Sequence, residues 1–428
     1  MGGVGDYRGV LGLLLVLLVA WAVSRARRDL AWRTVLGALV LQVLFAFLVL
    51  RWGPGRDALG WVSDRVQSLI GYADEGTSFL FGPLLDVGGG NQTIFALQVL
   101  PVIVFLGALI QLLFYLRVVQ WLTWAIGGAI AWVLRVSKVE AMYAATVIFL
   151  GQSEAPLMIA PYLARLRTGQ VFTVMTGGMA AAAGSTLVGY SLLGAPLEYL
   201  LAATVMNAPA SLLIAKIMWP EDRSEPVEAP AEGGTGDREQ EADPEEIDVR
   251  SVRDTESANV IDAISAGALA GGRIAVTVGA LLLAFVALIA LANGVLGAVG
   301  GWVGLDGLTF QGILGHAFAP VAWLLGVPWG EATQAGSYIG QKTVLNEFVA
   351  FADFGPQVGS LSTVTVAVVT FALAGFANFS SIAIQAGTLG SLREGLRSTV
   401  SRLGMRAVLA GLLANLANAA IAGLVIAH

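Results

Sequence analysis

Long apolar runs, separated by short polar or basic segments, dominate the pattern of this chain. A run of about 20 apolar residues has the length of a helix that crosses the hydrocarbon core of a bilayer. Because the runs are continuous and do not alternate with polar residues, they argue against a β-barrel. They predict an all-α polytopic membrane protein with about eight spans, near residues 7–24, 34–52, 94–116, 170–190, 200–219, 264–292, 364–388 and 405–427.

Two further segments are apolar, but Gly and Pro interrupt them before they reach spanning length. They lie near residues 140–165 and 318–345, and they carry Glu154 and Glu331. An ionisable side chain at membrane depth costs about 3 kcal/mol on insertion scales. Acidic residues in two matching, interrupted segments are typical of a solute site at the midplane of a transporter.

The two halves of the chain repeat one order of elements: a short hairpin, a broken span and another helix. The breaks are expected at residues 184–186 and 375–378. The positive-inside rule places the basic clusters in the cytoplasm, which puts both termini outside and makes the hairpins re-entrant from opposite sides. The repeats are therefore predicted to be inverted.

This organisation predicts five regions along the chain. They are N-terminal spans with an interfacial segment and a scaffold helix (1–136), a first repeat (137–219), an acidic cytoplasmic linker (220–263), a scaffold span with an extracellular segment (264–317) and a second repeat (318–428). The linker is too rich in charge, Pro and Gly to bury a core, so we expect a flexible loop. A tail that binds a partner is the alternative.

Composition supports a membrane protein and excludes several kinds of chemistry. The chain is 56% hydrophobic and 13% charged, whereas soluble domains carry roughly 25% charged residues. It has no cysteine and two histidines, which argues against metal sites built from these residues. No Gly-rich phosphate-binding loop ending in Gly-Lys occurs, so ATP is not expected to drive transport directly.

Polar side chains gather at the predicted hairpins and breaks. They supply amide, hydroxyl and carboxylate groups, which suit an uncharged solute with several donors and acceptors, such as a nucleobase on a sugar. Phe376 lies within one turn of Asn378 in the sequence, so its ring is placed to stack on an aromatic ring of the solute. Capping of helices by the carboxylates, and pairing of freed backbone groups by the amide and hydroxyls, are the structural alternatives. The polar residues are Gln152, Ser153, Glu154, Thr186, Glu331, Asn378 and Ser381.

Three long motifs carry a family resemblance from about residue 94 to the C-terminus. They are Gly151-Gln-Ser-Glu-Ala-Pro-Leu157, Gly340-Gln-Lys-Thr-Val-Leu-Asn-Glu-Phe-Val-Ala350 and Gly375-Phe-Ala-Asn-Phe-Ser-Ser-Ile-Ala-Ile384; Val327-Pro-Trp-Gly-Glu-Ala332 also fits. The chain resembles the bacterial branch of the concentrative nucleoside transporters. The resemblance implies a homotrimer in the bacterial inner membrane, whose transport domains move like elevators against a scaffold.

The resemblance also implies a role for each polar residue. Gln152, Ser153 and Glu154 would contact the base, with Thr186 beside it. Glu331, Asn378 and Ser381 would bond the ribose hydroxyls, and Phe376 would line the pocket. Glu347 is interpreted as a residue that stabilises the exit of the second hairpin.

The chain departs from the family at the sodium site that the resemblance implies. Val147 and Ala181 stand where the family has Asn and Ser side chains, so only the backbone carbonyls of Leu150 and Ala182 would remain. Hard cations need several oxygen ligands. Proton coupling through Glu154 or Glu331 is therefore favoured, because burial favours the neutral form of a carboxyl group; sodium coupling through backbone ligands is the alternative.

The leading hypothesis is an ion-driven symporter that imports nucleosides and uses no cofactor. A carrier of a free base or another neutral polar solute is the runner-up. An intramembrane enzyme with Glu154 and Glu331 as an acid–base pair lacks a nucleophile. A channel conflicts with two hairpins that each block one side, and nothing indicates binding of nucleic acid.

Overall fold

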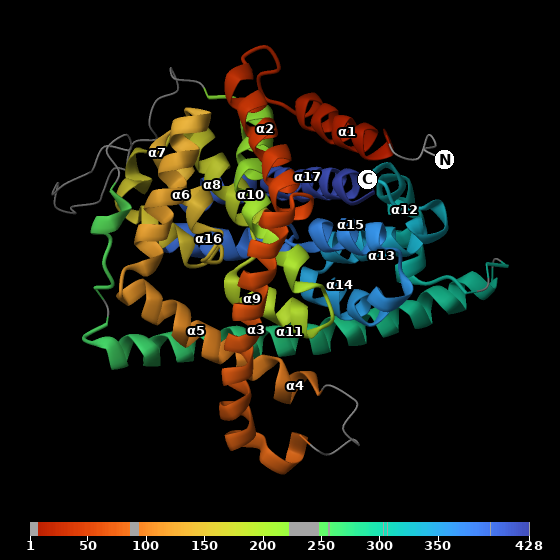
Figure 1. The fold of residues 1–428 in the computed structure, drawn as a ribbon. Helices are drawn as coiled ribbons and strands as arrows, with labels where there is room; N and C mark the ends of the chain where they lie inside the picture. The colour runs from red at the N-terminus through yellow and green to blue at the C-terminus, as the bar shows by residue number, and fades with distance from the viewer. Residues whose placement is uncertain are drawn as a thin grey trace.

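The computed structural model describes residues 7–85, 94–221, 248–255, 257–302, 304–305, 307–393 and 395–427 (Figure 1). These parts are helical and contain no β-strand. The α-helices are α1 (Arg8–Ala22), α2 (Trp32–Leu50), α3 (Gly53–Phe81), α4 (Phe95–Gln98), α5 (Leu100–Tyr115), α6 (Val118–Leu134), α7 (Lys138–Thr146), α8 (Thr168–Ala180), α9 (Gly184–Leu192), α10 (Leu197–Met218), α11 (Val260–Trp302), α12 (Phe310–Leu324), α13 (Trp329–Val344), α14 (Glu347–Phe354), α15 (Thr363–Leu373), α16 (Ser380–Leu392) and α17 (Leu396–Ala427). The 3-10 helices are η2 (Gly82–Leu85), η3 (Ala155–Arg165), η4 (Val249–Ser251) and η5 (Gly355–Ser360).

Burial divides the spanning helices into a core and a periphery. In the most apolar window of each helix, 94% of the residues are buried in the α8–α9 pair, 89% in α10 and 78% in α17. The corresponding share is 28% in α2, 28% in the α4–α5 pair and 22% in α11. The peripheral helices therefore present apolar faces outward, as a chain in lipid requires, and the core lies around α8, α10 and α17.

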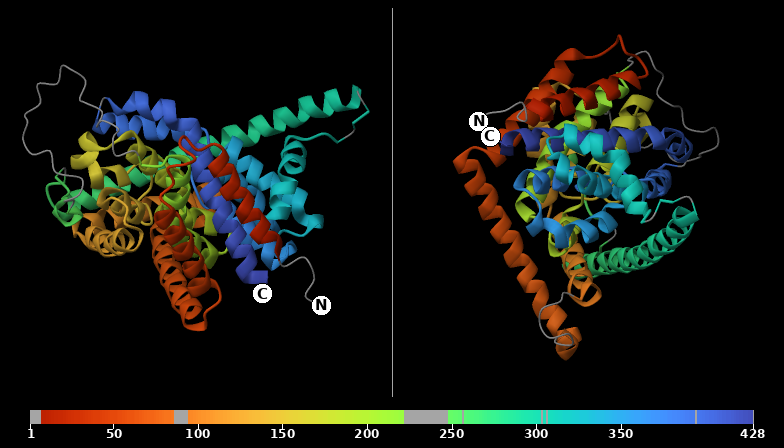
Figure 2. Two further views of the ribbon diagram at one scale, coloured as in Figure 1. Left: turned by 90° about the horizontal axis from the view of Figure 1, so that it is seen from above. Right: turned by 90° about the vertical axis from the view of Figure 1, so that its right-hand side faces the viewer.

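The two peripheral helices α5 and α11 pack against each other along one edge of the molecule, while α3 runs along its outside (Figures 1 and 2). Their contact depends on glycine. A Cβ atom at Gly107 would lie 2.6 Å from the carbonyl oxygen of Gly267, and one at Gly271 would lie 2.7 Å from that of Ile103. Small residues that let two backbones approach closely are the usual basis of helix packing in membranes.

One order of elements occurs twice in the fold. A long peripheral helix (α5, α11) precedes a second helix (α6, α12), a hairpin (α7 to η3, α13 to α14), a broken pair (α8–α9, α15–α16) and a long core helix (α10, α17). The second copy contains a sharp bend of 116° between α12 and α13. Gly326 in this bend has a φ of +111°, a conformation that favours glycine.

The all-α fold is confirmed, and most predicted elements occur near their expected positions. Six helices in the described ranges, with α4–α5 and α8–α9 counted as pairs, are long and apolar enough to cross a membrane; the bent pair α12–α13 would make a seventh. The interfacial segment contains the long helix α3. The acidic linker lies mostly outside the described residues, and the domain boundaries and the position of the termini stay predictions.

Three details differ from the prediction. Residues 118–134 form a separate helix, α6, that sequence analysis did not expect. The first break lies at residues 181–183, slightly before the expected position. The second hairpin turns at residues 345–346, well after Pro328 and Gly330, because the break at those residues is the bend that separates α12 from α13.

Candidate functional site

The first hairpin presents its polar residues in the turn between α7 and η3. Ser137 and Glu140 form a capping box that starts α7, and the helix ends at Thr146. The chain then turns back, and the backbone amide of Gly151 donates to Oε2 of Glu154 at 2.8 Å. This bond fixes the carboxylate of Glu154 at the turn of the hairpin.

The first broken pair lies directly behind this turn. The amide of Gly184, which begins α9, donates to the carbonyl of Phe149 at 3.3 Å. The hydroxyl of Thr186 donates to the carbonyl of Ala183 at 2.8 Å. Thr186 therefore points its hydroxyl at its own helix start, and it lines the site without a free donor.

The second break brings Asn378 and Glu347 together. Nδ2 of Asn378 donates to Oε2 of Glu347 at 2.8 Å, and Oδ1 of Asn378 accepts from the amide of Ser381 at 3.0 Å. The other oxygen of Glu347, Oε1, accepts from the hydroxyl of Tyr190 at 3.2 Å. Asn346 caps α14 through a 2.9 Å bond from the amide of Val349, and this places Glu347 in the first turn of that helix.

The two repeats meet through side chains at the breaks. Nε2 of Gln152 in the first hairpin donates to Oγ of Ser381 at 2.9 Å, and Nε2 of Gln385 donates to Oε1 of Gln152 at 3.2 Å. The backbones also join, since the amide of Phe376 donates to the carbonyl of Ala181 at 3.0 Å. A continuous set of hydrogen bonds thus runs from one break to the other.

These side chains line a cavity of about 290 Å³ between the hairpins, the breaks and α11. The volume is at the small end of ligand pockets, roughly 300–1,000 Å³, so the cavity suits a small molecule. Its polar lining has two carboxylates, amides and hydroxyls, together with one cation from α11. These residues are Gln152, Ser153, Glu154, Ser185, Thr186, Arg273, Thr277, Asn346, Glu347, Asn378, Ser380 and Ser381; Phe376 lines it as well.

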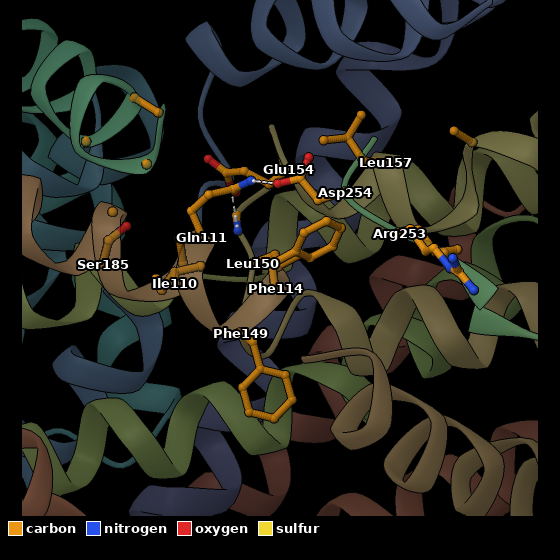
Figure 3. Close-up of a pocket in the computed structure, with 18 of the residues that line it drawn as sticks. Ile110, Gln111, Phe114, Phe149, Leu150, Glu154, Leu157, Ser185, Arg253 and Asp254 are labelled. Atoms are coloured by element: carbon orange, nitrogen blue, oxygen red, sulfur yellow. Dashed lines mark hydrogen bonds between the residues drawn. The ribbon is translucent and has the colours of Figure 1, made fainter. Parts of the chain in front are cut away.

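A larger cavity of about 540 Å³ adjoins the first and shares Glu154 and Ser185 with it (Figure 3). Helices α5 and α11 form one wall, and residues 251–255 form another. Asp254 accepts from Nε2 of Gln111 on α5 at 2.9 Å. At the start of this wall, hydrogen bonds from Arg250 hold the pKa of Asp248 below its usual range.

Seven of the eight predicted binding residues line the smaller cavity, and Glu331 does not. Glu331 lies in the first turn of α13, where its carboxylate accepts from the hydroxyl and the amide of Ser362 at 2.8 and 3.2 Å. Ser362 is the N-cap of α15. The expectation that Glu331 faces the solute site is therefore corrected: the residue ties the start of the second hairpin to the start of the second broken pair.

Glu347 is the carboxylate that sequence analysis missed. It was interpreted as a support for the hairpin exit, whereas it lines the cavity and is hydrogen-bonded to Asn378. The repeat itself held a signal for it. Glu154 follows the end of α7 at the turn of the first hairpin, so the matching acid belongs at the turn of the second hairpin.

The residues of the predicted sodium site offer few oxygen atoms to a metal ion. Val147 and Ala181 are buried at 2% and 1% exposure, and their side chains carry no oxygen. The carbonyls of Leu150 and Ala182 accept no hydrogen bond from the residues that the structure describes. These four residues therefore offer a hard cation no side-chain oxygen, and the carbonyl of Ala181 already accepts from the amide of Phe376.

Three family models match consecutive parts of the chain. "Na+ dependent nucleoside transporter N-terminus" matches residues 11–84, "Nucleoside recognition" matches residues 96–197, and "Na+ dependent nucleoside transporter C-terminus" matches residues 199–423. Together they extend over most of the sequence.

Individual proteins are similar over nearly the whole length. "Uncharacterized transporter YutK" of Bacillus subtilis is 50% identical over 98% of this chain and 99% of its own length. "Nucleoside permease NupC" of Helicobacter pylori is 42% identical over 97% of each chain. A solved structure of "CNTnw in an inward-facing substrate-bound state" has 44% identity and a TM-score of 0.89, and the match covers 99% of this chain and 98% of that one.

Proposed function

Because this multi-pass membrane protein belongs to the Na+ dependent nucleoside transporter family, we propose that it is a secondary active symporter that imports nucleosides through the cavity between its two repeats. The observation that carries the proposal is the set of bonds Glu347–Asn378–Ser381–Gln152, which joins both hairpins and the second helix break at one small polar cavity. Such a site holds a neutral, hydroxyl-rich molecule by many directed hydrogen bonds.

The second repeat supplies the groups that suit a ribose. The carboxylate of Glu347 and the amide of Asn378, 2.8 Å apart, accept and donate side by side, as vicinal hydroxyls require. Hydrogen bonds to a charged acceptor contribute about 1.5–3 kcal/mol. We assign the ribose to Glu347, Asn378 and Ser381, and this assignment replaces Glu331.

The first repeat supplies the groups that suit the base. Gln152 offers an amide, and Ser153 and Glu154 offer a hydroxyl and a carboxylate, all on the cavity wall. Thr186 contributes its methyl group, because its hydroxyl is bonded to the carbonyl of Ala183. Phe376 lies at the wall with 8% exposure and offers a ring face to a base.

The path of release follows from the larger cavity. It shares Glu154 with the binding cavity and is bounded by residues 251–255, which lie in the acidic linker. We place this linker in the cytoplasm of a bacterial cell, so the nucleoside leaves toward the cytoplasm. The buried core around α8, α10 and α17 then moves as the elevator against α5 and α11, whose exposed apolar faces suit a homotrimer and lipid in the inner membrane.

The donor set favours a proton over sodium as the coupling ion. Buried apolar side chains at Val147 and Ala181 leave only carbonyl oxygens for a metal ion, whereas Glu154 offers a carboxylate at the junction of both cavities. Sodium coupling through backbone ligands, and transport of a free base, are the competing proposals.

Uptake of labelled uridine into proteoliposomes tests the function. An inward proton gradient in sodium-free buffer is expected to accumulate unaltered uridine above its external concentration. Accumulation that needs a sodium gradient at constant pH would replace the proton with sodium. Failure to accumulate uridine, adenosine or any other nucleoside under either gradient would overturn the proposal, and a parallel assay with labelled uracil tests the free-base alternative.

A further inference from the structure

Lys342 is a buried cation that the proposed transport cycle does not use. It lies in the last turn of α13 with no solvent exposure. Its Nζ donates to the carbonyl of Ala372 at 3.0 Å and to Oδ1 of Asn415 at 2.7 Å. Among the described residues it forms no ion pair. Its hydrogen-bond acceptors are neutral oxygens, and the carboxylate that acts on it electrostatically is that of Glu347. A buried ammonium group without a hydrogen-bonded carboxylate is costly, so it is expected to have a specific role.

The carbonyl of Ala372 has no intrahelical backbone donor because α15 breaks. In a continuous helix it would accept from the amide of Phe376, four residues on. That amide donates instead to Ala181 of the first repeat. Ala372 therefore presents an orphan carbonyl at the negative end of the helix dipole, where a cation is favourable.

Asn415 extends the contact from Lys342 to both breaks. Its Nδ2 donates to the carbonyl of Ala180 at 2.8 Å and to that of Ala374 at 3.3 Å. No space is left at this junction, since a Cβ atom at Gly375 would collide with Oδ1 of Asn415 and with the carbonyl oxygen of Ala180. Lys342 is thus bonded into the point where the two broken helices meet.

We infer that Lys342 is a positioning residue whose ammonium group supplies the positive charge at the second helix break. By bonding to the end of α15 it holds the second hairpin in place, and so it sets the geometry of the nucleoside site. The inference rests on the proposed function for the identity of the solute. Lys342 precedes Glu347 by five residues across the hairpin turn, and Ala372 precedes Asn378 by six across the break. A shift between α13 and α15 would therefore move Glu347 relative to Asn378.

Equilibrium binding of uridine and hydrogen exchange of the uridine-free protein test this role together. Lys342→Met is expected to weaken uridine binding at least tenfold and to speed amide exchange in residues 374–379. The matched control is Lys138→Met, which removes an exposed lysine from α7 and should change neither measurement. Wild-type affinity and unchanged exchange in Lys342→Met would overturn the inference.

A second variant separates the effect of losing the charge from an effect on folding. Lys342→Gln keeps a hydrogen-bond donor without the charge, and it decides the matter if the Met variant does not fold. A loss of affinity like that expected for Met supports a role for the positive charge at the break, and wild-type affinity overturns it. If the wild-type protein binds no nucleoside, the proposed function fails, while exchange in residues 374–379 still decides the role of Lys342.

Discussion

The two repeats each bury a lysine, but they satisfy it with different chemistry. In the first repeat, Nζ of Lys216 on α10 lies 2.7 Å from Oε1 of Glu140 on α7, with Glu221 at 3.5 Å. In the second repeat, Lys342 donates hydrogen bonds to a backbone carbonyl and to the amide oxygen of Asn415, and no ion pair of Lys342 occurs among the described residues. The first lysine is neutralised by carboxylates away from the cavity, whereas the second stands at a helix break.

The two lysines also lie on elements that do not correspond, α10 and α13, so the repeated order of elements does not repeat the positions of buried charges. The acids at the hairpin turns, by contrast, do correspond, since Glu154 and Glu347 occupy the turns of the two hairpins and line one cavity. Glu331, which sequence position alone made the partner of Glu154, instead bonds Ser362 at the start of α15. Substitutions in both halves test how far they diverge.

The largest expected effect is on stability, at the ion pair of the first repeat. Lys216→Met leaves the carboxylate of Glu140 buried and unpaired, which typically costs 3–5 kcal/mol. We expect a marked fall in the thermal unfolding temperature in detergent. Adding Glu140→Gln, which removes the charge and keeps a side-chain oxygen as acceptor for the capping box, should restore most of the loss. A double variant as unstable as the single one would contradict stabilisation by the charge pair.

The next effect concerns the acid of the first hairpin. Glu154→Gln removes a charged acceptor from the cavity, which is expected to weaken uridine binding roughly 10- to 100-fold. Under the proton-coupling proposal it also abolishes the response of uptake to a pH gradient. Glu198→Gln removes an exposed acid from α10 and is the control. Uptake by Glu154→Gln that still follows a proton gradient would remove Glu154 as the proton carrier.

A moderate gain of function is expected at the first break. The double substitution Val147→Asn and Ala181→Ser adds two side-chain oxygens beside the carbonyls of Leu150 and Ala182. Saturating sodium should then tighten uridine binding about tenfold, a coupling of about 1.4 kcal/mol. The wild-type protein, titrated in sodium and in choline chloride, provides the reference. Equal sodium dependence before and after the change would show that the missing side chains do not decide the coupling ion.

The smallest effect is at the aromatic wall. Phe376→Ala is expected to weaken uridine binding by about 1 kcal/mol, or roughly fivefold, if the ring stacks on the base. Phe376→Tyr keeps the ring face and should bind within about twofold of wild type. A loss for ribose-free uracil as large as that for uridine places the ring on the base; a loss confined to uridine moves it to the sugar.

Most of the fold could be predicted from the apolar runs and their interruptions. The length of the long spans is set by bilayer thickness and is visible as apolar runs. The second break lies at its predicted residues, because polar residues and Gly interrupt the apolar run there. Helix α6 was missed because Val118 begins a new helix two residues after the preceding apolar run ends.

The errors at the site have a physical cause as well. Pro328 and Gly330 do mark a break, but it is the bend before α13, and the hairpin turn at residues 345–346 contains neither Pro nor Gly. Glu347 follows the N-cap Asn346, so it looks like an ordinary first-turn acid. The contact of Lys342 with Asn415 joins residues 73 positions apart, which one sequence cannot reveal.

Uridine affinity of Glu347→Gln beside Glu331→Gln, measured by isothermal titration at one pH, tests the central assignment most directly. The account predicts a loss of roughly 10- to 100-fold for Glu347→Gln, since a charged acceptor to the ribose becomes neutral, and a change below about threefold for Glu331→Gln. The reverse order, with Glu331 decisive and Glu347 dispensable, would contradict it.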